Sequence, residues 1–464
     1  MGGFKGEEAM DNLKTFFIAL VCFMILISFS RAFAQEKTAM VVLDLKQCID
    51  KAVALSPEIG EARYEVQVSK SKKAQADAAR YPQVEFLALT APSPRARGNQ
   101  VWSPDDSTRP VITGILGKAE VNLIQPLYTF GRISGFREAA EHGIKVSSAG
   151  VDRKVSDIIL RTKHLYYSIL LAKDLKRLAL GIRGDLVTAI EKVERHLDLG
   201  SPWADQIDLF KLNAFLGEVD RHLNEAEKGI LLAKDALRTS IGIAEDIEFD
   251  IIDNTLTREE IPIRALKDYI TDSRQLRPEF TQLREGLKAR EALVKAEMSN
   301  YYPMLFLGAR GSLAGASNRD RLRNPFVFDE FNHFYGTVFL GLKWSIDFGI
   351  TKGRVREAEA EHKKLLEKKR FADEGIPLEV RKAYLDLVKA GKNIEATERA
   401  CKNARKWIIT AVANFDMSVG EAEEIADAVI VYALARTHNL KSIYNERMSY
   451  ANLLYTTGMD RIEN

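Results

Sequence analysis

Hydrophobic residues change their spacing along this chain in an order that occurs twice. Residues 58–80 and 279–300 are rich in Ala, Lys, Glu and Arg and contain no proline, which predicts a helix in each place. Pro82 and Pro303 end these helices. Alternating apolar and polar residues follow in both places, and a period of two predicts strands. The recurrence indicates an internal repeat.

Each repeat contains one predicted hairpin, over 82–130 and over 303–348. The apolar face of the last strand is formed by Val338, Leu340, Leu342, Trp344 and Ile346. The apolar positions of the first hairpin are Val84, Phe86, Ala88, Ala119, Val121 and Leu123. Segments 91–112 and 312–334 are rich in Pro, Arg, Asp and Asn, which predicts exposed loops. Four strands are therefore expected.

Long helices are predicted after each hairpin, over 131–242 and 349–458. The clearest pattern is an uninterrupted 3,4 spacing of apolar residues over four heptads, which is typical of a coiled coil. These residues are Leu209, Leu212, Leu216, Val219, Leu223, Ala226, Ile230, Ala233 and Leu237. A helix of about 65 residues would be about 100 Å long. Gly375-Ile376-Pro377 predicts an interruption of the second long helix.

Short motifs recur between the two halves at nearly constant spacing, which indicates duplication. The matching pairs are Leu55-Ser56-Pro57-Glu58 with Leu276-Arg277-Pro278-Glu279, Tyr81-Pro82 with Tyr302-Pro303, and Ile241-Gly242 with Thr457-Gly458. We therefore divide the chain into a signal peptide over 1–34, a first repeat over 35–245, a linker over 246–262 and a second repeat over 263–464.

The N-terminus has the pattern of a secretory signal peptide. An apolar run from Thr15 to Phe29 precedes Ala32-Phe33-Ala34, which predicts cleavage after Ala34. A membrane anchor is the alternative, but a run of about 15 residues is shorter than the roughly 20 that span a bilayer. Met1 and Met10 are both possible starts.

Charge and motif content exclude several function classes. The 67 basic and 65 acidic residues leave a net charge of +2, which gives no electrostatic reason to expect nucleic acid as a partner. Nucleotide-binding, hydrolase and zinc motifs are absent, so we expect no enzyme, no cofactor and no metal site. The basic runs 70–73 and 363–370 are interpreted as solvated helix faces with acids nearby. Cys48 and Cys401 could form one disulfide, but a disulfide-built scaffold is excluded.

Aromatic residues are concentrated near the strand ends, as in the girdles of membrane barrels. They are Tyr81, Trp102, Tyr128 and Phe130 in the first half, and Tyr302, Phe326, Phe328, Phe331, Phe334, Tyr335, Trp344 and Phe348 in the second. A soluble hairpin with an apolar tip is the alternative. Four strands cannot close a barrel, and an open edge cannot lie in lipid, so several chains must pool their strands. Three chains would give twelve, which is enough for a channel.

In this order and spacing, the motifs resemble the TolC family of outer-membrane efflux proteins over nearly all of the mature chain. Further matches are the strand-to-helix junctions 125–132 and 344–349. The resemblance implies an α+β membrane protein: a homotrimer with a 12-stranded β-barrel in outer-membrane lipid of a Gram-negative cell, continued by an α-helical coiled-coil tunnel in the periplasm. It also implies an exit duct of a tripartite efflux or type I secretion system, working with an inner-membrane pump and a periplasmic adaptor.

The resemblance also implies two sites at the far end of the helices. The adaptor would dock on the two helix-turn-helix tips, at Leu199, Gly200, Ser201, Val419 and Gly420. Carboxylates just beyond the second tip would face a narrow opening, and the candidates are Glu421, Glu423, Glu424 and Asp427. Asp427 is favoured as inward-facing because it lies two turns into the helix. A solvated acidic helix start, favoured by the helix dipole, is the alternative for all four.

Two other functions compete with an exit duct. One is a periplasmic coiled-coil scaffold or adaptor without a membrane barrel, although such a protein needs no outward apolar strand face. The other is an outer-membrane hydrolase, for which no nucleophile and base are assembled in the sequence. The transported substrate is not specified by the sequence.

Overall fold

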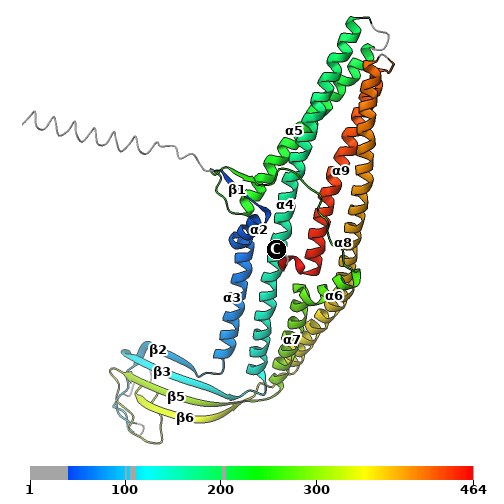
Figure 1. Ribbon diagram of the computed structural model, residues 1–464. Helices are drawn as coiled ribbons and strands as arrows, with labels where there is room; N and C mark the ends of the chain where they lie inside the picture. The colour runs from blue at the N-terminus through cyan, green and yellow to red at the C-terminus, as the bar shows by residue number, and fades with distance from the viewer. Residues whose placement is uncertain (1–39, 100–101, 105–110, 201–204, 418, 463–464) are drawn as a thin grey trace, which may run out of the picture.

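The computed structural model describes residues 40–99, 102–104, 111–200, 205–417 and 419–462, so the predicted signal peptide lies outside the described residues. The chain forms a long column of helices that ends in an antiparallel sheet (Figure 1). Two helices of 67 residues each, α4 (Arg132–Asp198) and α8 (Ile350–Asp416), run the length of the column. At 1.5 Å per residue each is about 100 Å long.

The sheet combines both predicted hairpins. Its strands are β2 (Gln83–Pro94), β3 (Ile112–Tyr128), β5 (Met304–Ala316) and β6 (His333–Lys343), in the order β2-β3-β5-β6. All neighbours are antiparallel, and the β3–β5 pairing joins the two repeats. The four predicted strands are confirmed, but β6 ends at Lys343, before Ile346 of the expected strand.

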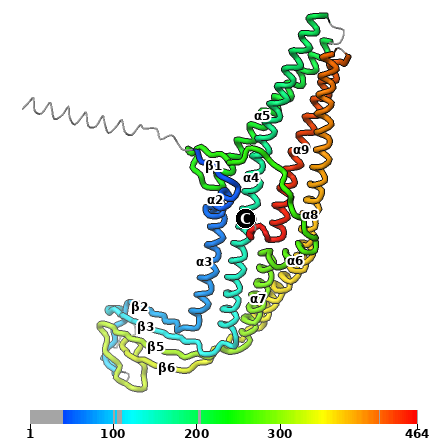
Figure 2. Tube along the Cα trace, viewed as in Figure 1, coloured from blue at the N-terminus to red at the C-terminus, as the bar shows by residue number. Residues whose placement is uncertain are grey.

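Each long helix is flanked by shorter helices over its two halves. Near the sheet these are α3 (Pro57–Ala78) and α7 (Pro278–Met298), and farther away α5 (Gln206–Ser240) and α9 (Ala422–Thr457). Figure 2 shows α3 and α5 one beyond the other along α4, with α7 and α9 between α4 and α8. The short helices α2 (Leu45–Leu55) and α6 (Leu266–Leu276) lie near the middle of the column.

The predicted coiled-coil helix is confirmed as α5, which packs along α4. All nine residues of its 3,4 stripe are buried or half-buried. Toward the far end, Leu212 of α5 joins one core with Val193 of α4, Phe415 of α8 and Val429 of α9. Four helices therefore share a single apolar core close to the turns, which fixes both helix pairs against each other.

The predicted interruption at Gly375-Ile376-Pro377 is wrong, because α8 continues through Pro377. Proline removes one backbone hydrogen bond and crowds the preceding turn. The residues around it are nevertheless held in place, since Ile376 is 6% and Val380 0% exposed. Tertiary burial on this side of α8 overrides the local preference.

The linker prediction for 246–262 needs a correction, since this segment contains a strand. Strand β4 (Phe249–Ile251) pairs in parallel with β1 (Val41–Leu43). Asp250 forms ion pairs with Lys173 of α4 and Lys234 of α5, each at 2.9 Å. Burial alone would raise the pKa of Asp250, but hydrogen bonds from the two lysines hold this pKa below its usual value. The segment is therefore bound across the helices.

The recurring motifs meet at the middle of the column. Gly242 and Gly458 both have a left-handed backbone, with φ of +67° and +76°. A Cβ at Gly242 would lie 3.0 Å from the side chain of Leu55, and one at Gly458 2.8 Å from the backbone of Leu276. The glycine that closes each half is thus fitted against the leucine that opens its Leu-x-Pro-Glu motif. This contact explains why both motifs recur together.

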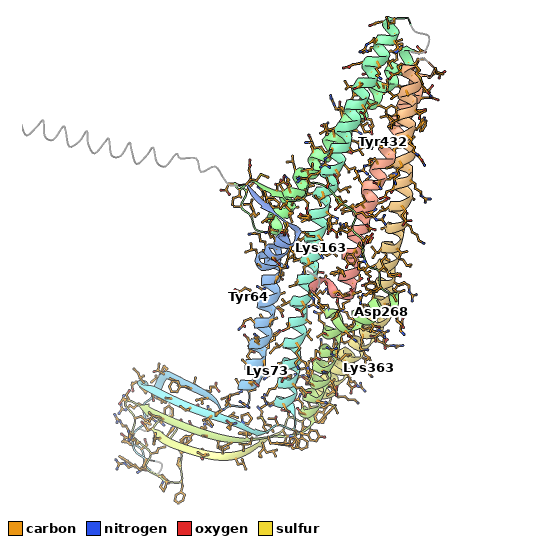
Figure 3. All side chains as sticks on the ribbon, in the orientation of Figure 1. Tyr64, Lys73, Lys163, Asp268, Lys363 and Tyr432 are labelled. Carbon is orange, nitrogen blue, oxygen red and sulfur yellow. The ribbon has the colours of Figure 1, made fainter. Side chains whose placement is uncertain are left out.

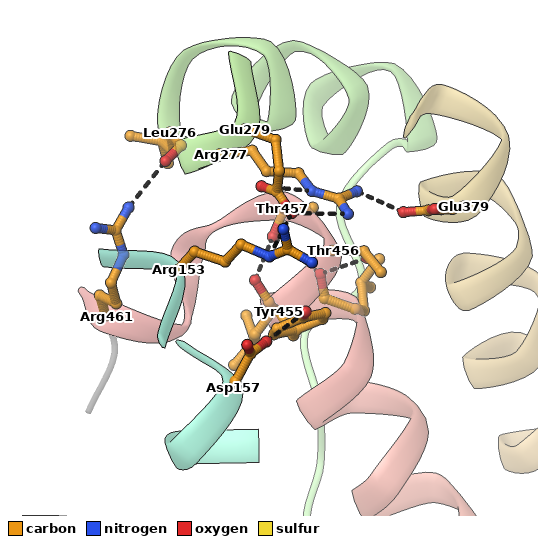
Figure 4. A network of polar contacts seen from close by, with 12 residues as sticks. Arg153, Asp157, Leu276, Arg277, Glu279, Glu379, Tyr455, Thr456, Thr457 and Arg461 are labelled. Carbon is orange, nitrogen blue, oxygen red and sulfur yellow. Dashed lines mark hydrogen bonds and ion pairs between the residues drawn. The ribbon is translucent and has the colours of Figure 1, made fainter. Parts of the chain in front are cut away.

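A polar network surrounds the second of these contacts (Figure 4). Arg277 is buried and contacts Glu279 at 3.1 Å and Glu379 of α8 at 2.6 Å. Tyr455 donates a hydrogen bond to Asp157 of α4 at 2.8 Å. The network therefore joins α4, α7, α8 and α9 at one level.

Cys48 and Cys401 are both free thiols, so the disulfide that the sequence allowed is not formed. Cys48 is fully buried in the core beneath β1 and β4. Burial raises the pKa of its thiol to about 12. Cys48 therefore serves as a small apolar core residue.

Gly458→Ala is predicted to destabilise the protein by roughly 1–3 kcal/mol, because the left-handed backbone disfavours a side chain and the new Cβ meets the backbone of Leu276. Gly217→Ala is the matched control, since nothing lies within 4 Å of its Cβ position in α5. It should stabilise by roughly 0.5–1 kcal/mol. Thermal unfolding followed by circular dichroism tests both. Equal melting temperatures for Gly458→Ala and wild type would contradict the prediction.

Candidate functional site

The sheet has two chemically different faces. Strand register places one set of apolar side chains on a common face, including Phe86, Leu123, Leu307, Val338, Leu340 and Leu342. Val338, Leu340 and Leu342 are 69%, 65% and 63% exposed. Exposed apolar surface of this extent on a strand marks contact with lipid or another chain.

The opposite face of the sheet carries the charged and polar groups, beside exposed apolar side chains of Leu87, Ile124 and Phe339. Lys118 and Glu120 on β3 form an ion pair at 2.8 Å, and Arg310 on β5 approaches Glu120 at 3.4 Å. Ser312 and His333 are hydrogen-bonded at 2.7 Å across β5 and β6. Alternation of apolar and charged residues therefore separates an apolar side from a water-compatible side of the same sheet.

Two recesses continue the polar face onto the helices. Gln83, Phe306 and Lys343 of the sheet line a recess of about 320 Å³ together with Ala76 of α3 and Phe136 of α4. The same two helix residues also line a larger recess of about 1180 Å³ formed by α3, α4, α7 and α8, here called the sheet-side recess. We call this continuous surface the inner face.

The strand-to-helix junctions are fixed by glycine, by aromatic contacts and by capping. Gly131, with φ of +98°, precedes α4, and the ring of Phe130 stacks on Tyr302 at 5.1 Å. Before α8, Asp347 accepts hydrogen bonds from the backbone and hydroxyl of Thr351 at 2.9 and 2.6 Å. These bonds hold the pKa of Asp347 below its usual value. Most of the predicted aromatics here are solvent-exposed, Trp344 at 54% and Tyr128 at 58%.

At the other end of the sheet, the two hairpin loops are bonded to each other. Arg97 of the first loop contacts Asp320 at 3.0 Å and Asn318 at 2.7 Å in the second. Ala96 and Arg319 form an isolated parallel bridge. The two repeats are therefore joined at the loop end as well as along β3 and β5.

The described tip residues adjoin the helix ends at the far end of the column (Figure 1): Leu199 and Gly200 follow α4, and Val419 and Gly420 lie between α8 and α9. Leu199 and Val419 are 76% and 70% exposed. Gly200 has φ of +67°, which suits the tight turn after α4. The backbone amides of Val419 and Gly420 both donate to the carbonyl of Asn414, at 3.0 and 3.2 Å. Ser201 lies outside the described residues.

The four predicted carboxylates are all exposed. Glu421 is the residue before α9, and Glu423 forms an ion pair at 2.6 Å with Lys211 of α5. Glu424 lies about 100° around α9 from Glu423, and Asp427, four residues after Glu423 and three after Glu424, lies between them.

Heptad spacing relates Glu424 and Asp427 to the inner face. They precede Asn445 and Met448 by three heptads each, and these two residues line a recess of about 670 Å³ shared by α4, α8 and α9. Asp157 of that recess lies two heptads after Gly143 of the sheet-side recess, so both open on the same side of α4.

Two ion pairs that the sequence did not predict join the helix pairs near the tip. Lys192 of α4 contacts Asp416 of α8 at 2.7 Å, and Lys211 of α5 contacts Glu423 of α9 at 2.6 Å. The hydrogen bond to Glu423 raises the pKa of Lys211. These contacts are between residues more than 200 positions apart, so no local spacing could have identified them.

Membrane-spanning helices and metal-holding clusters are both absent from the described residues. None of the described helices has both the length and the apolar composition needed to cross a membrane. Within residues 40–462, leaving out the undescribed gaps, no three His, Cys, Asp or Glu side chains are placed to hold a metal ion.

No protein-family model matches the sequence, and no curated protein matches it either. Solved structures do match. CusC, whose structures concern folding and transmembrane channel formation, is 17% identical with a TM-score of 0.74, over 92% of this chain and 96% of that chain. The outer-membrane protein VceC from Vibrio cholerae is 15% identical with a TM-score of 0.72, over 89% and 96%. The open-state MtrE outer-membrane channel of Neisseria gonorrhoeae is 17% identical with a TM-score of 0.69, over 89% and 88%.

The chain therefore has the fold of the TolC-type outer-membrane channels, a helical column joined to an antiparallel sheet. The resemblance inferred from the recurring motifs is confirmed for the fold. At these identities the comparison establishes the architecture alone.

Proposed function

We propose that this protein is an outer-membrane exit duct that works as a homotrimer. The observation that carries the proposal is the sheet, in which an exposed apolar face lies opposite a charged one. In the described part of the chain, β2 and β6 are edge strands with one neighbour each. Three copies joined at these edges would form a closed 12-stranded barrel with the apolar faces toward lipid.

The helical column would continue the barrel as a tunnel into the periplasm. Its inner face continues the polar face of the sheet, so a single water-filled path would run through both. Transport would be passive in this protein and driven by an inner-membrane pump through a periplasmic adaptor. Leu199, Gly200, Ser201, Val419 and Gly420 would then dock the adaptor.

A periplasmic scaffold without a barrel is the competing function. The helical column would serve such a scaffold equally well. Exposed Val338, Leu340 and Leu342 favour the duct, because a water-soluble sheet would bury this face.

A trimeric channel is the first prediction of this proposal. Removal of residues 1–34 leaves about 48 kDa per chain, so the detergent-corrected mass of protein extracted from outer membranes should be about 145 kDa. The same preparation should form conducting channels in planar bilayers without any partner. A water-soluble monomer or dimer with no conductance would favour the scaffold instead.

The ion pairs near the tip are predicted to keep the far end of the tunnel narrow. Lys192→Gln combined with Lys211→Gln removes both contacts between α4–α5 and α8–α9. Each exposed pair stabilises the closed arrangement by less than about 1 kcal/mol. Loss of both pairs should therefore raise basal single-channel conductance severalfold. Arg221→Gln is the control, because in the described chain the ion pairs of Arg221 are with Glu218 and Glu225 of its own helix. An equal rise in the control would contradict this gate.

Glu424 and Asp427 are predicted to favour cations at the tunnel opening. Repeated threefold, they would form a ring of negative charge at the inner face. Glu424→Gln with Asp427→Asn should shift the reversal potential in a salt gradient toward lower cation preference. Glu357→Gln with Glu359→Gln, at exposed positions near the sheet end of α8, removes the same charge far from the opening and is the control. An unchanged reversal potential in the double variant would remove these residues from the opening.

A further inference from the structure

The sheet-side recess combines an apolar wall with an excess of positive charge. It has a volume of about 1180 Å³, larger than most small-molecule pockets. Its depth comes from small residues such as Ala140, Gly143 and Gly286. Bulky apolar side chains form the wall, among them Phe136 and Phe371, which are 38% and 78% exposed. Large aromatic side chains exposed in a recess mark a place where a ligand or another chain can bind.

The carboxylates of the recess are already neutralised. Glu279 contacts Arg277 at 3.1 Å and Arg153 at 3.8 Å, and Glu379 contacts Arg277 at 2.6 Å. Arg290, another basic residue of the recess, approaches Glu361 of α8 at 3.6 Å. The acids of this region therefore attract no further cation strongly.

Two lysines of the recess differ from the lysines that directly follow them in the sequence. Their neighbours Lys73 and Lys369 form ion pairs with acids four residues later, at 2.6 and 2.7 Å. Lys72 of α3 and Lys368 of α8, by contrast, have no ion-pair partner among the described residues. Both lysines are exposed, as the interpretation of these runs as solvated helix faces expects, and both line the recess.

We propose that the sheet-side recess is a binding site for amphipathic organic anions, such as aromatic or aliphatic carboxylates and sulfonates. The apolar body would lie against Phe136 and Phe371, and the anionic group would pair with Lys72 or Lys368. The inference rests on the proposed function, because in the trimer the inner face lines the duct. Organic anions would then be the molecules preferred near the sheet, whereas the acidic residues at the tip would prefer cations.

The test uses block of single-channel current by two compounds that share one ring system. Naphthalene-2-sulfonate carries a negative charge and 2-naphthylmethylammonium a positive one. The sulfonate should block wild-type channels, and Lys72→Gln with Lys368→Gln should raise its half-blocking concentration about tenfold, equivalent to about 1.4 kcal/mol. Phe371→Ser should raise the half-blocking concentration as well, because it removes apolar contact while keeping both charges.

Matched controls are available on the same two helices. Lys70 and Lys363 are also exposed, and the helical repeat turns them roughly 160° and 140° away from Lys72 and Lys368. Figure 3 labels Lys363 on α8. Lys70→Gln with Lys363→Gln removes the same net charge, yet it should leave block by the sulfonate unchanged. Block by the ammonium compound should not become weaker in the Lys72→Gln, Lys368→Gln double variant.

The outcomes separate this inference from the proposed function. Channels that conduct but are not blocked by the sulfonate would overturn the binding site and leave the duct intact. The same holds if both double variants weaken the block equally, since the effect would then be one of net charge. Failure to form any channel would overturn the duct and this inference together.

Discussion

Backbone hydrogen bonding at the two edges of the four-stranded sheet is the constraint on which the rest of the molecule depends. In lipid an unpaired amide or carbonyl costs several kcal/mol, so an open sheet is not tolerated there. Strand β2 and strand β6 each have one side without a strand in the described chain. In the proposed trimer the edge of one copy meets the other edge of the next. Closure of the sheet then also sets the spacing of the helical columns that continue from it.

The column shows how a duplicated sequence diverges while its geometry is retained. In the first half, Glu58 at the start of α3 pairs with Arg161 of α4. In the second half, Arg277 at the start of α7 pairs with Glu379 of α8, which is the counterpart of Arg161 in the repeat alignment. The two pairs do not match position for position, because Arg277 aligns with Ser56 and the counterpart of Glu58 is Glu279, which itself contacts Arg277. Each half nevertheless joins its corresponding helices, α3 with α4 and α7 with α8, by an ion pair beside the same motif.

Periodicity in the sequence predicted most of the fold, because strands and coiled-coil helices each impose a spacing that side chains must follow. The long helix after Gly131 and the stripe from Leu209 to Leu237 are confirmed on this basis. The predicted break at Pro377 is wrong because burial of its neighbours outweighs a local preference. The strand within 246–262 was not predicted because its three residues carry no periodic signal. Contacts such as Lys192 with Asp416 depend on how the two halves pack, which spacing within one segment does not contain.

Paired and unpaired charges have different roles along this molecule. Charges between helices are matched, as in Lys211 with Glu423, and such contacts fix one helix pair against another. Other charges have no ion-pair partner in the described chain, such as those of Lys72 and Lys368 near the sheet. They can attract an anion that lies in the recess. A duct lined in this way would attract cations at its tip and anions near its barrel, at positions separated by most of the helix length. A molecule carrying both charges would then meet an attractive group at each end, whereas a small ion of either sign would meet an attractive region and a repulsive one. In the proposed duct this arrangement would favour passage of larger amphipathic molecules over simple ions.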